Sequence, residues 1–260
     1  MDEHATGQLT ATAADYYEAF FVPALFGSRT GPLLELAGIS SGDTVLDVGC
    51  GTGILARDCW RRMSARGSVT GIDCNEGMIA TASKVAPEIE WHIGQAEALP
   101  FDNSAFDFVI SQFALMFFED GPKALQEMWR VTRPGGKLVV AVWDKLENTP
   151  GYAAMTALDE RLFGREVAEQ LIAPYSMGDR ALLETLFRQS GIPDIDIVTH
   201  NGMAEFPSIK AWVDLDVNGW TLGELIGPEG HALLVETAER ELQDFVQPDG
   251  RVAFPAPSHM

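Results

Sequence analysis

Short apolar runs that end at a glycine or at a polar residue recur along the first half of the chain. They cover residues 44–48, 68–73, 90–94, 106–111 and 138–143. Runs of this length are typical of strands buried in a parallel sheet. Between the runs, apolar residues recur at helical spacing, as in residues 54–63, and Pro122 opens a further helix. Strands that alternate with helices predict an α/β fold.

The most informative stretch is TVLDVGCGTG, residues 44–53, where the first strand runs into its helix. Gly49, Gly51 and Gly53 occupy every second position, and a turn without Cβ atoms lets the main chain touch a ligand. The third glycine comes one residue early for a dinucleotide loop, and Ile54-Leu55 replaces the Lys-Ser or Lys-Thr of a phosphate-binding loop. This spacing favours a ligand loop over a bare turn and disfavours a nicotinamide dehydrogenase.

Asp47 precedes the three glycines in the order acid, x, G-x-G-x-G. This order resembles motif I of the class I S-adenosylmethionine-dependent methyltransferases. The string RVTRPGGKLVV, residues 130–140, is similar to the same family, in particular to the branch around the ubiquinone and menaquinone C-methyltransferases. The resemblance covers residues 45–143 and fades afterwards. It implies S-adenosylmethionine as the cofactor, S-adenosylhomocysteine as the product and no metal.

The resemblance also implies the architecture. We expect a Rossmann-like, doubly wound, seven-stranded and mostly parallel sheet with its last strand antiparallel, in a single domain of residues 1–260. Residues 1–40 would form lid helices, the second of them after Pro32, and residues 41–145 the cofactor-binding core. Residues 146–260 would complete the sheet, with helical cap insertions at 149–173 and 207–247. Residues 195–206 are expected to form strand six, and strand seven is 251–254 or, as the alternative, 203–206.

Several side chains beyond the glycine loop are candidates for cofactor contacts. Asp73 ends the second strand and could accept both ribose hydroxyls, although an aspartate there could also cap the next helix. The resemblance implies that Met78 lies on the adenine, that Gln95 replaces an aspartate at the adenine amino group, and that Tyr17 reaches the amino-acid end. Met78 and Tyr17 could equally be core packing. The predicted cofactor-binding set is Tyr17, Asp47, Gly49, Cys50, Gly51, Thr52, Gly53, Asp73, Cys74, Met78, Gln95, Ala96, Glu97, Ser111 and Gln112.

The sequence identifies no catalytic residue. Candidate bases in the second half, such as His200 and Asp216, are more often structural, and Cys50 stands at a helix start without a partner base. Aromatic residues outside the glycine loop favour a bulky, partly apolar acceptor, such as a quinone, a phenol or a polyketide, unless they are core. These residues are Phe113, Phe117, Phe118, Tyr152, Phe163, Tyr175, Trp212 and Trp220.

The amino-acid composition limits the kinds of molecule that we expect the protein to bind. A formal net charge of −20 opposes binding to nucleic acid or to an anionic membrane, which leaves a small-molecule acceptor. Three cysteines without CxxC spacing argue against a disulfide framework or a zinc site and predict a reducing cytoplasm. The sequence predicts a monomer or a homodimer that transfers a methyl group to O, N or C. The alternative is a regulatory or scaffold protein that binds S-adenosylmethionine without turnover.

Overall fold

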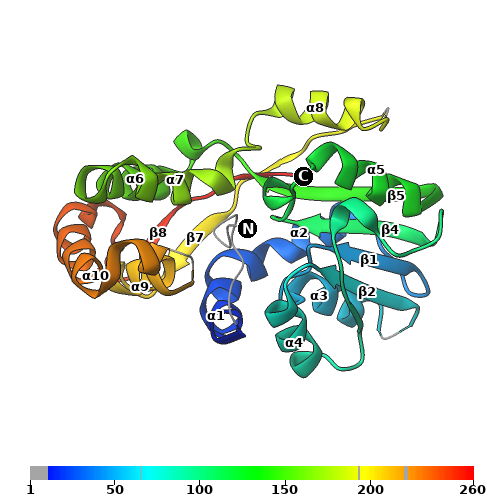
Figure 1. The fold of residues 1–260 in the computed structure, drawn as a ribbon, viewed down its shortest axis with the longest axis horizontal. Helices are drawn as coiled ribbons and strands as arrows, with labels where there is room; N and C mark the ends of the chain where they lie inside the picture. The colour runs from blue at the N-terminus through cyan, green and yellow to red at the C-terminus, as the bar shows by residue number, and fades with distance from the viewer. Residues whose placement is uncertain (1–10, 65, 193, 220–221) are drawn as a thin grey trace.

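The computed structural model describes residues 11–64, 66–192, 194–219 and 222–260 (Figure 1). A seven-stranded sheet in the order β3-β2-β1-β4-β5-β9-β6 forms its centre. Strands β1 to β5 run parallel, and β9 is antiparallel to both of its neighbours, which confirms the predicted fold class. These strands are β1 (Thr44–Val48), β2 (Ser68–Asp73), β3 (Glu90–Ile93), β4 (Phe106–Gln112), β5 (Thr132–Trp143), β6 (Thr199–His200) and β9 (Ser258–His259).

Both faces of the sheet are covered, because consecutive apolar residues of a strand point to opposite sides. Val45 belongs to one buried cluster, together with residues of α2 and α3, and Leu46 belongs to a second cluster, with residues of α5 and α8. Figure 1 shows α4 beside α3. The flanking helices are α2 (Gly27–Ala37), α3 (Ile54–Arg62), α4 (Glu76–Val85), α5 (Gly121–Val131) and α8 (Arg180–Gln189).

The N-terminal segment is helical without a break from α1 (Ala11–Tyr16) through η1 (Tyr17–Phe26) into α2. The prediction that the second helix follows Pro32 is therefore wrong, since α2 already begins at Gly27 and contains the proline. Buried residues on both sides of Pro32 pack into the core and hold the helix together despite the missing N–H group. The predicted stop at Gly38 is confirmed by its left-handed backbone, with φ of 76°.

Both alternatives for strand seven are wrong. Residues 203–206 and 252–255 pair with each other as β7 (Met203–Phe206) and β8 (Val252–Pro255), in a separate two-stranded sheet. The chain then passes from the small sheet to the main one, where β9 takes the expected antiparallel place beside β5. Prolines end β8 and precede β9, and proline cannot donate to a strand ladder, so the two short strands remain separate.

Four helices gather around the small sheet, on the left in Figure 1: α6 (Pro150–Phe163), α7 (Arg165–Ile172), α9 (Ile209–Gly219) and α10 (Leu222–Glu241). The first two are separated at Gly164, which has φ of 90°. The last two lie in sequence between β7 and β8, so they are an insertion in that hairpin. Single-turn helices complete the chain: η2 (Ala96–Ala98), η3 (Leu115–Phe117), η4 (Leu146–Asn148), η5 (Ala173–Tyr175) and η6 (Gln243–Phe245).

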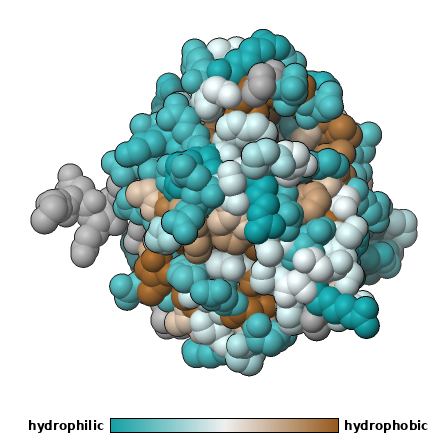
Figure 2. All heavy atoms as spheres, turned by 90° about the vertical axis from the view of Figure 1, so that its right-hand side faces the viewer, coloured by the Kyte–Doolittle hydropathy of each residue, from teal (hydrophilic) through white to brown (hydrophobic). Residues whose placement is uncertain are grey.

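Figure 2 shows the right-hand side of Figure 1, where polar side chains cover most of the face and apolar ones are scattered among them. This distribution agrees with the strong negative charge of the sequence. Within the described ranges, every helix is too short or too polar to cross a membrane.

Candidate functional site

A cavity of about 700 Å³ opens beyond the carboxyl ends of β1, β2 and β4. Ligands of open α/β sheets bind at this edge, and the volume is that of a small-molecule site. The predicted cofactor-binding residues come together here, since all of them except Gly53 and Ser111 line the cavity. Their role in binding remains a prediction.

Gly53 and Ser111 support the wall from behind. A Cβ atom on Gly53 would lie 2.2 Å from the ring of Trp91, and the residue has φ of 87°, so its glycine serves packing and the turn into α3. The hydroxyl of Ser111 is buried and donates to the carbonyl of Val48 at 2.7 Å. It ties β4 to the end of β1 and therefore points away from the cavity.

Asp73 holds two segments of the wall with its carboxylate. Oδ2 accepts from the Gly51 N–H at 2.8 Å, and Oδ1 accepts from the Asn75 N–H at 2.9 Å. The cap of α4 is Asn75, whose Oδ1 accepts from the N–H of Met78 at 3.0 Å, so the capping alternative for Asp73 is wrong. Each oxygen of Asp73 keeps a lone pair for a ligand hydroxyl. Burial raises the pKa of Asp73, and the two N–H groups partly offset that rise.

Asp47 is the second acid at this end of the cavity and is 1% exposed. Its Oδ2 accepts from the N–H of Ala56 at 3.1 Å, so it also caps the first turn of α3. Burial raises its pKa to about 8, with a smaller contribution from Asp73 and an opposing one from the Ala56 N–H. A bound cation would stabilise the ionised form of such a buried carboxyl.

The remaining predicted residues at this end are mostly apolar or weakly polar. Cys50 is buried, and burial together with Asp73 and Asp47 raises the pKa of its thiol well above the usual value, so it stays protonated. A protonated thiol is no nucleophile. Met78 is 8% exposed and lines the wall from α4. Its contact with an adenine remains a prediction. Gln95, Ala96 and Glu97 follow β3 and enter η2.

The N-terminal helical segment is bonded directly to the glycine loop. Glu18 accepts from the hydroxyl of Thr52 at 2.6 Å with Oε2, and its Oε1 forms an ion pair with Nη2 of Arg57 at 2.6 Å. Tyr17, the preceding residue, lines the cavity, and its ring is 4.0 Å from the place of a Cβ on Gly51. The family resemblance led to Tyr17, but no spacing connects Glu18 with Arg57, which lies in α3.

Aromatic side chains line the other end of the cavity. Of the predicted acceptor set, Phe113, Phe117, Phe118, Tyr152 and Tyr175 are on the wall, whereas Phe163 and Trp212 are not and Trp220 lies outside the described residues. Trp212 is 0% exposed and belongs to the core around β7 and β8. Sequence reasoning missed further wall residues that carry no motif, namely Trp143, Pro174 and Ala256.

Phe113 stands where the two ends meet. It has φ of 56°, an unusual value for a bulky residue, and its ring stacks on Trp143 at 4.0 Å between centroids. The neighbouring Gln112 donates from Nε2 to the carbonyl of Phe26 at 3.3 Å, while its Oε1 is buried without a partner among the described residues. An unpaired buried oxygen can accept a hydrogen bond from a ligand.

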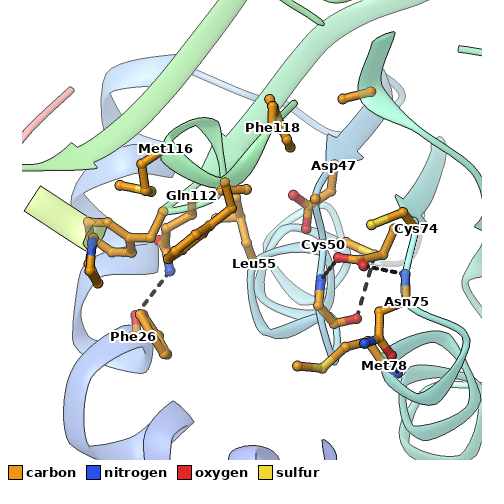
Figure 3. A pocket seen from close by; sticks show the side chains of 18 of the residues that line it. Phe26, Asp47, Cys50, Leu55, Cys74, Asn75, Met78, Gln112, Met116 and Phe118 are labelled. Carbon is orange, nitrogen blue, oxygen red and sulfur yellow. Dashed lines mark hydrogen bonds between the residues drawn. The ribbon is translucent and has the colours of Figure 1, made fainter. Parts of the chain in front are cut away.

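Figure 3 shows the two ends of the cavity. Asp47, Cys50, Cys74, Asn75 and Met78 lie together on one side, and Phe26, Gln112 and Met116 on the other. Among the described residues, no group of three or more His, Cys, Asp or Glu side chains is placed to hold a metal ion. The arrangement offers a polar end that fits a nucleoside with a cationic group and an aromatic end that fits a second, flat molecule.

A sequence model of the methyltransferase domain matches residues 46–140, the stretch that builds the polar end of the cavity. Residues 46–140 are a class I S-adenosylmethionine-dependent methyltransferase domain. The polar end of the cavity thus belongs to the methyltransferase domain, and most of the aromatic end lies outside it.

Curated relatives resemble the methyltransferase domain over a limited stretch. The ubiquinone/menaquinone biosynthesis C-methyltransferase UbiE of Hydrogenovibrio crunogenus is 35% identical over 119 residues, which cover 44% of this chain and 47% of the relative. The demethylmenaquinone methyltransferase of Renibacterium salmoninarum is 39% identical over 109 residues, covering 42% and 45%. The chain thus spans about half the length of the curated relatives that it matches.

Solved structures extend the likeness of fold beyond the methyltransferase domain. The Haemonchus contortus phosphoethanolamine N-methyltransferase 2, in complex with S-adenosyl-L-methionine, aligns with a TM-score of 0.61 at 20% identity over 97% of this chain and 57% of that chain. The YcgJ protein of Bacillus subtilis aligns with a TM-score of 0.57 at 20% identity, covering 89% and 95%. At these identities the alignments support the fold alone.

Proposed function

We propose that the whole chain is an S-adenosylmethionine-dependent methyltransferase that acts on a small, flat and partly apolar acceptor. The observation that carries the proposal is the single cavity, in which the acidic glycine-loop end is continuous with an aromatic end. When bound, the cofactor supplies an activated methyl group on a sulfonium. The chain's own part is to align an acceptor with that methyl and to exclude water.

The residues at the polar end fit this cofactor in chemistry. Asp73 has free lone pairs for the two ribose hydroxyls, Met78 offers a flat apolar contact for a base, and Asp47 offers negative charge to a cationic group. Glu18 and Thr52 join the lid to the loop directly above this end, which supports a role for Tyr17 in covering the cofactor.

The acceptor class follows from the other end of the cavity. Its wall combines Phe26, Phe113, Trp143, Tyr152 and Tyr175 with the unpaired amide oxygen of Gln112. Flat aromatic walls favour flat ligands through stacking and edge contacts. A quinone, a phenol or a polyketide ring fits this description, and the names of the UbiE relatives support the quinone class.

A turnover assay with methyl-labelled S-adenosylmethionine tests the proposal. The panel contains flat hydroquinones and phenols, together with linear amines of similar mass as the contrasting class. We expect labelled product with at least one flat acceptor, and a rise in melting temperature with S-adenosylhomocysteine but not with NADH. Thermal stabilisation without turnover on any acceptor would favour the binding-only regulator, and stabilisation by NADH alone would refute the proposal.

A further inference from the structure

The charges around the cavity are distributed unevenly. Among the described residues, the Asp, Glu, Lys, Arg and His side chains on its wall are Asp47, Asp73, Glu97 and Glu119, all of them acids. Asp47 and Asp73 belong to the glycine-loop end, and Glu97 accepts from the N–H of Asp120, which places Glu119 near the same end. At the aromatic end, none of the wall residues that the structure describes is an Asp, Glu, Lys, Arg or His.

A buried cation lies one layer behind the aromatic end. Arg29 is 0% exposed, and its guanidinium carbon lies 4.6 Å from the ring centroid of Trp143. It donates to the carbonyls of Leu25 and Ala256, the latter at 2.8 Å. Trp143, Leu25 and Ala256 all line the cavity, so a single layer of residues separates the cation from the ligand space.

Among the described residues, Arg29 has no compensating anion. It donates to three backbone carbonyls, including that of Met203 at 3.3 Å, and no carboxylate of the described residues pairs with it. Its Nε is buried and has no partner in the same part of the chain. In a chain with 38 acids and 18 basic residues, a fully buried and unpaired arginine is conspicuous, because burying an uncompensated charge is costly.

The buried acids in the cap do not cancel this charge. Asp216 accepts from the hydroxyl of Tyr152 at 3.0 Å, and burial raises the pKa of this carboxyl well above its usual value. Burial also raises the pKa of Asp159 to about 7. In the part of the chain that the structure describes, neither carboxyl pairs with Arg29, so neither forms an ion pair that would neutralise its charge.

From this placement we infer that Arg29 selects an acceptor with a negatively charged oxygen, such as a phenolate, an enolate or a carboxylate, and disfavours amines. The inference rests on the proposed function and adds the charge of the acceptor. The acidic glycine-loop end of the cavity suits the cationic cofactor. The aromatic end, with Arg29 behind its wall, suits the anionic acceptor. Opposite potentials at the two ends would keep each ligand in its own half of the cavity.

An anionic acceptor also needs no general base, and the described wall of the aromatic end offers no Asp, Glu, His or Lys as one. The charged oxygen, or the carbon conjugated to it, forms the new bond to the methyl group. The carbon–sulfur bond breaks with its electron pair moving to sulfur. A negative acceptor and a positive sulfonium become two neutral products, so no proton has to be removed during the transfer.

Arg29 could instead be only a structural link, since its carbonyl partners join α2 to β7 and to the segment after β8. A binding experiment with three probes of one ring system separates the two roles. The probes are 2-naphthoate, 2-naphthalenemethanol and 2-naphthylmethylamine, which are negative, neutral and positive at pH 7.5. They are titrated into protein saturated with S-adenosylhomocysteine, because this product lacks the sulfonium charge and leaves Arg29 as the cation to be tested.

We expect the wild type to bind 2-naphthoate about tenfold or more tightly than the neutral alcohol, and the amine most weakly. Arg29→Lys keeps the charge and should keep the order. Arg29→Met should bring the three affinities to within about threefold. Arg130→Met is the matched control, because Arg130 also donates to carbonyls, those of Leu99 and Phe101, away from the cavity wall. It should keep the wild-type order.

A wild type that binds S-adenosylhomocysteine but does not rank 2-naphthoate first overturns the inference. Retention of the anion preference in Arg29→Met also overturns it. If Arg29→Met fails to fold, the order of the three probe affinities in the wild type and in Arg29→Lys still tests the inference. An arginine that is only a structural link gives no reason for the anionic probe to bind most tightly. Failure of the wild type to bind S-adenosylhomocysteine refutes the proposed function itself, and the inference falls with it.

Discussion

Single carboxyl groups of this chain have different roles because their surroundings differ. Asp73 accepts two backbone N–H groups at the rim of the cavity, whereas Asp159 is fully buried in α6 and neither of its oxygens has a partner among the described residues. The sequence predicted the place of Asp73 from its distance to the glycine loop. It could not predict the state of Asp159, because that depends on which residues the fold packs around it.

Replacing Asp73 by alanine should lower the affinity for S-adenosylhomocysteine by roughly ten- to a hundredfold. The change removes an acceptor whose hydrogen bonds, as those of a charged group, are worth about 1.5–3 kcal/mol. Isothermal titration calorimetry measures the effect. Asp107→Ala is the control, since Asp107 likewise accepts a backbone N–H, from Thr44, but lies off the cavity wall. Equal affinities of Asp73→Ala and wild type would remove Asp73 from the cofactor site.

Asp159 should make the stability of the protein depend on pH. Burial raises its pKa from 3.8 to about 7, so the folded state retains a proton that the unfolded state loses. The free energy of unfolding therefore falls as the pH rises from 4 to 7 and levels off above 7. The Asp159→Asn variant has no carboxyl to ionise and does not lose this stability. Its free energy of unfolding should exceed that of the wild type by about 4 kcal/mol at pH 8, and by much less at pH 4.5.

Urea unfolding of the Asp159→Asn variant at several pH values provides the measurement. Asp244→Asn serves as the control, because Asp244 is exposed in η6. If Asp159→Asn and wild type lose stability in parallel between pH 4.5 and pH 8, the carboxyl of Asp159 does not remain protonated in the folded protein.

Among the elements, the helices and the first five strands were largely predictable, and the pairing of the last strands was not. The apolar runs at residues 44–48, 68–73 and 106–111 predicted β1, β2 and β4, since burial of a strand on both faces leaves a clear pattern. β6 and β9 contain two residues each, too few for any period to show. Their pairing is determined by where the chain emerges from the cap, which is a property of the tertiary structure.

The contact between the N-terminal helical segment and the glycine loop should depend on Glu18. Glu18→Ala removes the acceptor of the Thr52 hydroxyl and leaves Arg57, with a side chain 7% exposed, without its carboxylate. Loss of one partner of a buried ion pair is strongly destabilising. We expect amide exchange in residues 14–26 to become about tenfold faster or more. Mass spectrometry of deuterium uptake measures this.

Glu35→Ala is the matched control for that experiment. Glu35 also lies in the N-terminal helical segment and pairs with an arginine of α3, Arg62, but at 3.9 Å and with both side chains exposed. It should leave the exchange of residues 14–26 unchanged. In the wild type, S-adenosylhomocysteine should slow exchange in residues 11–26 more than in α8. Identical exchange in residues 11–26 with and without the ligand would mean that the segment is no lid.

At the scale of the whole molecule, β9 joins β5 to β6 at one side of the main sheet. It pairs with Val142 and Trp143 of β5 on one side and with β6 on the other. Its residues are buried, and Nε2 of His259 approaches the Gly178 carbonyl at 3.1 Å. The aromatic end of the cavity therefore depends on a strand that contributes no residue to its wall.

Removal of residues 258–260 should separate the functions of the two ends. β5 and β6 lose their shared partner, so we expect a melting temperature lower by several degrees or more and a weakened aromatic end. The glycine-loop end rests on β1, β2 and β4 and should keep its affinity for S-adenosylhomocysteine to within about threefold. Differential scanning fluorimetry and calorimetry measure the two quantities. An unchanged melting temperature would show that β9 contributes nothing to the sheet.

The position of β9 has a consequence for how the chain folds. Three neighbouring pairs of the sheet, β1 with β2, β2 with β3, and β4 with β5, follow each other directly in sequence, whereas Trp143 of β5 pairs with Ser258 across the entire cap. Closing so long a loop costs entropy before any contact repays it, and such pairings form slowly. A nascent chain can thus assemble the glycine-loop end of the cavity early and complete the aromatic end only in the last step of folding.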